Sequence, residues 1–502
     1  MKQNKNFVQI LLVFTIVLTA CASCMVGPNY KTPSAAHVPP EWQKEEGGAV
    51  SFLQQEPQAN WWKVFQDPLL SKYMELGMEN NKDLLSAEAN ILKARALRQV
   101  AASKFYPQVG FDANASRTEY SKNGPLVTET AGAGPMAHAF QLQNLFNILF
   151  DASWELDLFG KTRRSVQAAE ANIGSSIEQK NNLLISIMGE VARNYFEIRS
   201  FQMQKELVEQ DIALLQQSAH VEKQNFTYGY RNLLDLDRIE AQLSQAQAEL
   251  PTIIASIYRG IYALSALTGH LPETFTKELL IFQPLPKPPL EVAVGLRSDL
   301  LRRRPDVRKA ERDLAAATAN IGVAVADFYP NFVLGANAGL QSLKIANLFQ
   351  LPSKTWEYGG DVTLPVFKGG KLVGNLRVAK AETAVAAYTY QQTVLNALSE
   401  TESAIKNYKE DLSSAHSQKQ SVEKTQMVTT LSQEQYANGL VNIIDFINTK
   451  RTLIASEKIL LSDDTRSLLD LVILYKALGG GWQTAKEDPL ILKVLDTYTK
   501  KH

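Results

Sequence analysis

The chain has 502 residues, enough for several domains, and its 45% apolar content is ordinary for a folded protein. Its 52 Lys and Arg balance its 52 Asp and Glu, which argues against nucleic-acid binding, because that needs a basic excess. The two cysteines lie close together near the N-terminus, and the six histidines are scattered without metal-ligand spacing. We therefore expect no disulfide, metal site or cofactor in the body of the chain.

The N-terminus has the pattern of a bacterial lipoprotein signal. Two lysines precede an apolar run over residues 7–18, which is too short to span a bilayer. The run ends in Leu18-Thr19-Ala20-Cys21, so we predict export and a lipid anchor on Cys21, with Cys24 as the alternative acceptor. A metal-binding Cys-x-x-Cys and a plain secretory leader are the competing interpretations. Acylation anchors a chain without a spanning helix, and we predict no later α-helical membrane span.

A polar, proline-containing tether follows, and then a helical pattern from about residue 67 to residue 104. The sequence Phe105-Tyr106-Pro107 ends that helix, because proline lacks an amide donor and disfavours helical geometry before it. Apolar residues then alternate from Val109 to Ala115 and again from Ala152 to Leu158, on either side of a loop rich in Gly, Ala, Ser and Thr. Period-two alternation predicts a β-hairpin.

Long helices dominate the remainder of each half. Apolar residues in the first run are spaced by four and three, from Leu184 through Met188, Val191 and Tyr195 to Ile198, as in a coiled coil. A break at residues 228–232 separates this run from a return helix, and the same plan recurs after a break at residues 436–439. Each outward run has roughly 60 residues and would span on the order of 90 Å.

The order of helix, hairpin, long helix and return helix therefore occurs twice, which predicts an internal duplication. We expect a chain that is mainly α with a small β part. The predicted organisation is a signal peptide (1–20), an acylated tether (21–60), a first repeat (61–269, hairpin 105–160), a connector (270–291), a second repeat (292–482, hairpin 328–368) and a C-terminal tail (483–502).

Four strands of about ten residues, apolar on one face, have the length needed to cross an outer membrane. Four strands cannot close a barrel, and an open sheet in lipid would leave backbone groups unpaired. The subunit would therefore share a barrel with copies of itself, and three copies give twelve strands. The alternative is a soluble hairpin on a coiled-coil protein.

Five motifs connect the chain with a known family. In order they are Cys24-Met25-Val26-Gly27-Pro28-Asn29-Tyr30, Trp61-Trp62 with Phe65-Gln66-Asp67-Pro68, Trp154-Glu155-Leu156-Asp157-Leu158-Phe159-Gly160-Lys161, Arg303-Arg304-Pro305-Asp306-Val307, and Lys476-Ala477-Leu478-Gly479-Gly480-Gly481-Trp482. Over nearly its whole length the chain resembles the TolC-like outer membrane efflux proteins, specifically the NodT-type lipoproteins of tripartite, RND-type efflux systems. The first motif favours Cys24 as the lipid acceptor.

The resemblance implies a homotrimer in the Gram-negative outer membrane, lipid-anchored and with a long periplasmic extension. A twelve-stranded transmembrane β-barrel would continue into a twelve-helix α-barrel, with four strands from each chain. A periplasmic adaptor protein and an inner-membrane pump would be its partners, and it would conduct small molecules such as drugs to the exterior. The chain would not be an enzyme, and no nucleophile elbow, metal cluster or phosphate loop is present. A type I secretion channel and a structural envelope-spanning coiled-coil lipoprotein are the alternatives.

The same resemblance places the periplasmic entrance and adaptor contact at the two helix turns. The expected residues are Tyr228, Gly229, Asn232, Leu233 and Asp235 in the first turn, and Tyr436, Gly439, Leu440 and Asn442 in the second. Gate candidates beside the second turn are Asp445, Asn448 and Arg451, although Asp445 and Arg451 also fit an ordinary solvated helix. Arg302, Arg303 and Arg304 before Pro305 are predicted to be a solvated helix start without a function.

Overall fold

The computed structural model describes residues 25–32, 42, 51–55, 58–119, 121, 142–289 and 291–484. The predicted signal peptide and both candidate lipid acceptors, Cys21 and Cys24, lie outside these residues. The chain divides into two compact units. The sheet unit comprises Met1–Thr32, Lys93–Ile173 and Arg312–Tyr388, and the helical unit comprises Pro33–Leu92, Gly174–Glu311 and Thr389–His502.

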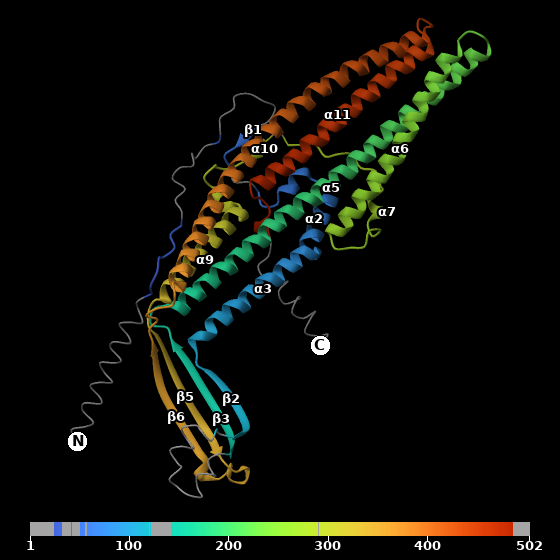
Figure 1. The fold of residues 1–502 in the computed structure, drawn as a ribbon. Helices are drawn as coiled ribbons and strands as arrows, with labels where there is room; N and C mark the ends of the chain where they lie inside the picture. The colour runs from blue at the N-terminus through green and yellow to red at the C-terminus, as the bar shows by residue number, and fades with distance from the viewer. Residues whose placement is uncertain are drawn as a thin grey trace, which may run out of the picture. The chain divides into compact units, whose positions relative to one another are not determined.

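The elements of the described chain follow the predicted order, and Figure 1 labels the main helices and strands. In sequence they are β1 (Ser51–Leu53), η1 (Trp61–Phe65), α2 (Pro68–Asn80), α3 (Lys82–Ala102), η2 (Ser103–Phe105), β2 (Gln108–Glu119), β3 (Leu142–Leu156), α5 (Lys161–Thr227), α6 (Leu233–Leu267), α7 (Thr276–Leu279), β4 (Glu291–Ala293), α8 (Leu300–Arg303), α9 (Pro305–Ala326), β5 (Asn331–Ser342), η4 (Ile345–Asn347), η5 (Leu351–Ser353), β6 (Lys354–Thr363), α10 (Lys371–Ala437), α11 (Ile443–Ala477) and η6 (Trp482–Thr484).

The two halves contain long helices of matching length. Helices α5 and α10 each have 67 residues, and the return helices α6 and α11 each have 35. By length and composition alone, helix α6 is long and apolar enough to cross a membrane. Buried core helices of soluble proteins share these two properties.

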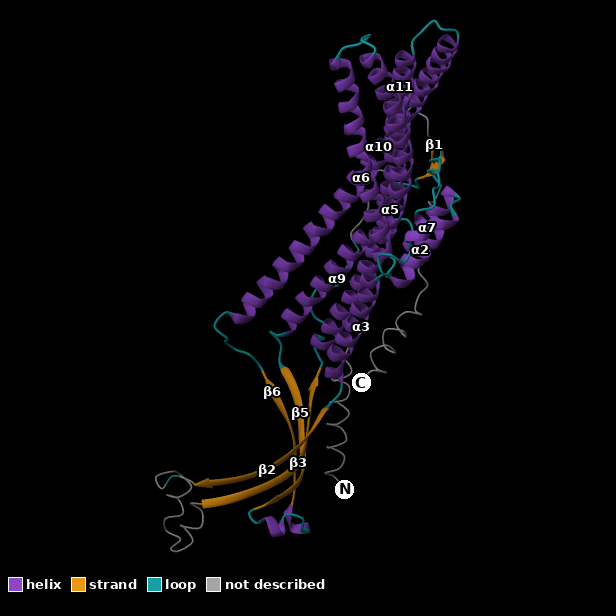
Figure 2. Ribbon diagram, turned by 90° about the vertical axis from the view of Figure 1, so that its right-hand side faces the viewer, coloured by secondary structure: helices purple, strands orange, loops and turns teal. Residues whose placement is uncertain are grey.

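The sheet unit contains a four-stranded antiparallel sheet in the order β2-β3-β5-β6, drawn in orange in Figure 2. Its register aligns apolar side chains into rows across one face, because alternate residues of a strand point to the same side. One row is Phe111, Phe150, Ala338 and Trp356, and the next is Val109, Ala152, Ala336 and Tyr358. The opposite face carries the carboxylates Asp112, Asp151, Glu155, Glu357 and Asp361.

The helical unit has an apolar core to which α2, α5, α6 and α11 contribute. The Trp61-Trp62 motif is buried there, and the Trp61 ring stacks on Tyr475 with 5.1 Å between the ring centroids. Asp67 caps α2 by accepting hydrogen bonds from the backbone amides of Leu69 and Leu70. The Tyr195 hydroxyl donates a 2.5 Å hydrogen bond to the other oxygen of Asp67. This motif therefore fastens α2 to α5.

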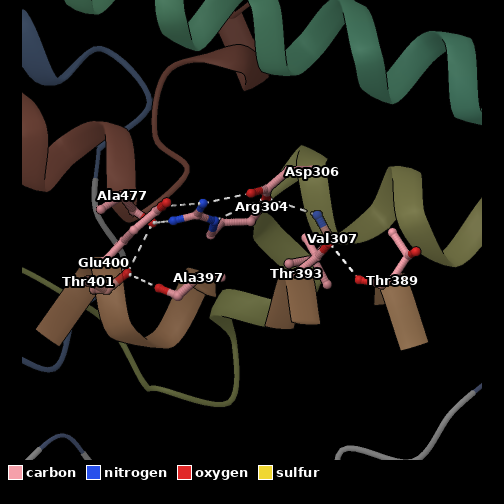
Figure 3. Close-up of polar contacts among 9 residues, drawn as sticks. All are labelled: Arg304, Asp306, Val307, Thr389, Thr393, Ala397, Glu400, Thr401 and Ala477. Atoms are coloured by element: carbon pink, nitrogen blue, oxygen red, sulfur yellow. Dashed lines mark hydrogen bonds and ion pairs between the residues drawn. The ribbon is translucent and has the colours of Figure 1, made fainter. Parts of the chain in front are cut away.

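Arg304 does not lie in the solvated helix start that the sequence predicts. Its side chain is buried before α9, where its guanidinium contacts Asp306 at 2.6 Å and Glu400 at 2.7 Å (Figure 3). It also donates a 3.0 Å hydrogen bond to the carbonyl oxygen of Ala477 near the end of α11. Burial of a charge is tolerated because carboxylates and a carbonyl surround it. The arginine thus joins α9, α10 and α11, which a sequence pattern cannot reveal.

Candidate functional site

The first helix turn has a closed hydrogen-bonding pattern at the end of α5. Gly229 adopts a φ of 75°, which favours glycine, and apart from Gly229 and its two chain neighbours no atom lies within 4 Å of the position that a Cβ would occupy. The Gly229 amide donates to the carbonyl of Phe226 at 3.0 Å, and the Tyr230 amide donates to that of Asn225 at 2.8 Å. This is a Schellman termination. Glycine is thus needed at this position for backbone conformation rather than for space.

The second turn repeats this geometry at the end of α10. Gly439 has a φ of 72°, its amide donates to the carbonyl of Tyr436 at 3.0 Å, and the Leu440 amide donates to that of Gln435 at 2.9 Å. Asn232 and Asn442 then cap the return helices by accepting hydrogen bonds from the amides of Asp235 and Asp445. The two predicted sets of turn residues therefore have equivalent backbone geometry.

The two turns differ in the side chains that they expose. In the first turn, Tyr228 and Tyr230 are 73% and 79% exposed, and Leu233 and Leu234 are also exposed. In the second turn, Leu440 is exposed, whereas Tyr436 stacks on Phe446 with a centroid distance of 5.7 Å. Exposed aromatic and leucine side chains next to one another are typical of protein contact surfaces. The first turn therefore offers the larger apolar surface.

Of the three gate candidates, only Arg451 joins α11 to other helices. Its Nε donates to Asp211 of α5 at 2.7 Å, and its Nη1 donates to Gln242 of α6 at 2.7 Å. Asp445 and Asn448 are exposed, and their side chains make no hydrogen bond or ion pair within the described part of the chain. The structure therefore does not bring Asp445 and Arg451 together.

Arg451 begins a row of polar contacts that the sequence reasoning missed. One and two heptads further along α11, Lys458 pairs with Glu249 of α6 at 3.2 Å, and the Thr465 hydroxyl donates to that of Ser200 of α5 at 2.8 Å. Residues seven apart lie on one face of a helix, so these three side chains form a seam between the two helical hairpins. The heptad spacing of Arg451, Lys458 and Thr465 was the available signal.

A carboxyl pair lies on the side of α11 that faces α10. Burial, a hydrogen bond with Asp411 and the charge of Asp411 raise the pKa of Asp470 to about 7, and Arg466 partly opposes this rise. Arg466 itself contacts Asp411 at 2.8 Å and Asp463 at 3.0 Å. Asp470 therefore keeps its proton up to near neutral pH, chiefly because burial disfavours the charged carboxylate and also because of the hydrogen bond with Asp411.

This pair predicts a pH-dependent stability. In the unfolded chain Asp470 would titrate near its usual pKa of about 3.9. Because Asp470 binds its proton more tightly in the folded chain, protonation of Asp470 stabilises the fold. This stabilisation is fully present at pH values below the unfolded pKa and is lost as the pH rises through the folded pKa of about 7. We expect Asp470→Asn to raise the thermal unfolding temperature more at pH 8 than at pH 4, measured by circular dichroism. An equal change at both pH values would contradict a shared proton.

In the sheet unit, a buried arginine holds the segment that follows Cys24. The Arg164 side chain is 0% exposed, and it donates to the carbonyls of Val26 and Gly27 at 3.1 and 3.0 Å and to the Asn29 side chain at 2.9 Å. A Cβ at Gly27 would lie 2.5 Å from the Cα of Gly322. The Val-Gly-Pro-Asn segment of the tether thus docks on α5 and α9.

The described residues contain no group of His, Cys, Asp or Glu that could hold a metal ion. Instead, the fold combines a sheet with one apolar face and two pairs of long helices that end in exposed turns. This combination indicates a channel protein of the outer membrane.

Comparison with known proteins gives the family. The model of the family described as outer membrane efflux protein matches residues 75–270 and 296–480, and the chain belongs to this family. It is 30% identical over 480 residues to the solvent efflux pump outer membrane protein SrpC of Pseudomonas putida, covering 93% of this chain and 98% of that protein. It is 27% identical to the cation efflux system protein CusC of Escherichia coli O157:H7 over 477 residues, 94% of this chain and 99% of that one.

The fold agrees with a solved channel. The structure of the outer-membrane channel OprN superimposes with a TM-score of 0.81 and 27% identity, covering 92% of this chain and 100% of that one. The predicted family, the outer membrane location and the function in efflux are therefore confirmed. The family is one of transport channels rather than enzymes.

Proposed function

We propose that three copies of this chain form the exit duct of a tripartite efflux system. The observation that carries the trimer is the open sheet. Within the described chain β2 pairs only with β3, and β6 pairs only with β5, so each has one edge without a partner. Unpaired backbone groups are costly in a membrane, and pairing β6 of one copy with β2 of the next removes them. Three copies then give a closed barrel of twelve strands.

The two faces of the sheet support this arrangement. Side chains such as Val109, Trp356 and Val362 are largely exposed on the apolar face, where lipid would cover them. The opposite face of the four described strands carries carboxylates and no Lys or Arg, as suits a water-filled interior. Strands of 10 to 15 residues are long enough to cross the hydrocarbon layer at a tilt.

The long helices also present surfaces that neighbouring copies would cover. On α10, Val378, Val385, Tyr388 and Leu395 are 56–71% exposed, at spacings of seven and three. Such a stripe is typical of a coiled-coil seam that awaits a partner helix. Four long helices from each of three copies would form a twelve-helix barrel. The equal helix lengths and the division of the family match into two segments favour two repeats, 61–269 and 292–482, joined by the connector 270–291.

The transport partners follow from this architecture. We place the periplasmic entrance at the two turns, with the exposed Tyr228, Tyr230 and Leu233 as the main contact for a periplasmic adaptor protein. An inner-membrane pump would supply the energy and select the substrate. The names of the relatives, a solvent efflux protein and a cation efflux protein, favour small molecules as the cargo. The polar seam that begins at Arg451 would hold the entrance closed.

We propose a lipid anchor on Cys24 rather than on Cys21, the first choice from the sequence. The Val26 amide donates to the carbonyl of Phe159 at 3.2 Å, and Met25 lies against Gly160, just beyond the end of β3. A lipid on Cys24 would be one residue from this docked segment, beside the sheet that we place in the membrane.

Mass spectrometry of the mature N-terminal peptide tests the position of the lipid. Because the signal is cleaved before the acylated cysteine, we expect a lipidated peptide that begins at Cys24 and disappears in Cys24→Ser but persists in Cys21→Ser. A lipidated peptide beginning at Cys21 would restore the first choice.

The function itself is tested by the mass of the detergent-purified protein and its conductance in planar bilayers. We expect the mass of a trimer and stable single-channel currents, because a sheet can form a pore through lipid only as a closed barrel. A monomer without conductance would show that the sheet is not a membrane barrel. The structural lipoprotein would then be the better explanation.

A further inference from the structure

The connection between β5 and β6 exposes an unusual number of apolar side chains. It directly follows the 12 residues of β5 and therefore lies at the end of that strand away from α9. Leu343, Ile345, Phe349 and Leu351 are 57–77% exposed in this short loop. We refer to residues 343–353 as the apolar loop. Exposing so many large apolar groups to water is unfavourable, so another apolar phase should cover them.

The apolar loop has a defined conformation of its own. The 3₁₀ turns η4 and η5 form within it, and the buried Leu348 lies between them. The Ser353 hydroxyl donates to the carbonyl of Asn347 at 2.7 Å, and the Ser342 hydroxyl donates to that of Lys344 at 2.8 Å. These contacts pair several polar groups inside the loop, which lowers the cost of moving its apolar side chains into a less polar environment.

Charge and position indicate what covers the loop. Residues 343–354 contain Lys344 and Lys354, both exposed, and no Asp or Glu. Lys354 begins β6 on the same face as Trp356 and Tyr358, whose rings stack 5.7 Å apart. Aromatic side chains mark the interfacial girdle of membrane barrels, and lysines just beyond it reach lipid headgroups. The loop thus continues the lipid-facing surface of the sheet with an apolar and basic segment.

We propose that the apolar loop inserts into the outer leaflet and that Lys344 and Lys354 bind the phosphates of an anionic lipid there. This inference rests on the proposed membrane sheet. It assigns the apolar side chains to the boundary of the acyl chains and the two ammonium groups to the headgroups, the arrangement of an interfacial membrane segment. The loop would then fix the depth of the barrel and select phosphorylated lipid around it.

The test uses the full-length protein in nanodiscs of phosphatidylcholine with or without phosphorylated lipid A. A solvatochromic dye on Gln350→Cys reports the environment of the loop, and the parent chain treated with the same dye gives the background. We expect quenching by brominated lipid and protection from aqueous iodide. Phe349→Ser/Leu351→Ser should abolish both.

The lysines are tested by titration with lipid A. Each lysine near an anionic surface contributes a similar amount to the free energy of binding. Lys344→Gln/Lys354→Gln should therefore weaken the apparent affinity for lipid A about 30-fold. The matched control, Lys368→Gln/Lys371→Gln, removes two exposed lysines at the opposite end of β6 and should leave the affinity nearly unchanged.

Three results would overturn the proposal. The first is full access of iodide to position 350, and the second is an equal loss of lipid A affinity in the control variant. The third is direct contact between dyes on neighbouring copies, which would show that a second copy covers the loop. Conductance of the same samples separates this inference from the proposed duct. Conducting trimers with a water-exposed loop would refute only the lipid contact, whereas absent conductance would refute the duct.

Discussion

Replacing Arg304 by alanine is expected to lower the free energy of unfolding by about 3 kcal/mol, the lower end of the range for breaking a buried ion pair. The guanidinium is buried between Asp306 and Glu400, and it also satisfies the carbonyl of Ala477 (Figure 3). Alanine would remove this partner from the Asp306 carboxylate and from the carbonyl, to which the Thr401 hydroxyl would still donate. Because Glu400 is half exposed, water would compensate part of the loss.

Chemical denaturation of the detergent-solubilised protein, followed by circular dichroism, measures this effect. Arg466→Ala is a suitable control because it removes another interhelical arginine whose side chain is 49% exposed, and we expect a loss of about 0–1 kcal/mol. Arg304→Lys should fall between the two, since an ammonium group cannot reproduce the forked contacts of a guanidinium. Equal losses in the free energy of unfolding for Arg304→Ala and Arg466→Ala would show that Arg304 does not stabilise the helical unit more than an exposed arginine does.

Local patterns made the turns and long helices predictable from the sequence. Gly229 and Gly439 signal chain positions with positive φ, and Asn232 and Asn442 signal helix starts, so each turn is encoded within a few residues. The apolar spacing around Leu184 likewise predicts a buried helical face, and the structure buries it. These features depend on neighbours along the chain, which is why a sequence pattern carries them.

The strands were less completely predictable. Alternation in the first hairpin indicated a second strand only from Ala152 to Leu158, whereas β3 begins at Leu142. The reason is that Leu145 and Leu149 lie on the polar face beside the apolar residues Phe146, Ile148 and Phe150, which removes the period of two. The parallel pair of β1 and β4 was missed because each strand has three residues, too few for any period to appear.

Contacts between distant residues could not be predicted at all. Arg304 meets Glu400 across 96 residues, and Arg451 meets Asp211 across 240. In the sequence each arginine is one charged residue on a helix, and its partner is decided by how the helices pack. The sequence therefore indicated that Arg451 lies beside the second turn, but it could not indicate that its contact is with α5 and α6 rather than with Asp445.

Arg451→Ala is expected to raise the conductance of the reconstituted channel, because it removes the first contact of the polar seam. Arg451 holds α11 against Asp211 of α5 and Gln242 of α6, and both ionic partners are only partly exposed, so salt screens them incompletely. Lys458→Ala alone should have a smaller effect, since its contact with Glu249 is longer and more exposed. The double variant should exceed either single one.

Single-channel recording at constant salt measures the effect, and a charge swap tests its cause. Arg451→Asp/Asp211→Arg restores opposite charges and should return conductance toward the wild-type value, whereas Arg451→Asp alone should increase it further by repulsion. Lys205→Ala controls for loss of a lysine, because Lys205 pairs with Glu209 on its own helix.

Asp445→Ala distinguishes the seam from an acidic ring at the entrance. Because the Asp445 side chain has no partner within the described chain, its removal should leave the contacts between the hairpins intact. An increase in conductance with Asp445→Ala but not with Arg451→Ala would contradict the seam and assign the gate to carboxylates at the turn. An increase in conductance with Arg451→Ala that the charge swap reverses would instead show that contacts between α11 and the helical hairpin of α5 and α6 in the same chain keep the entrance closed.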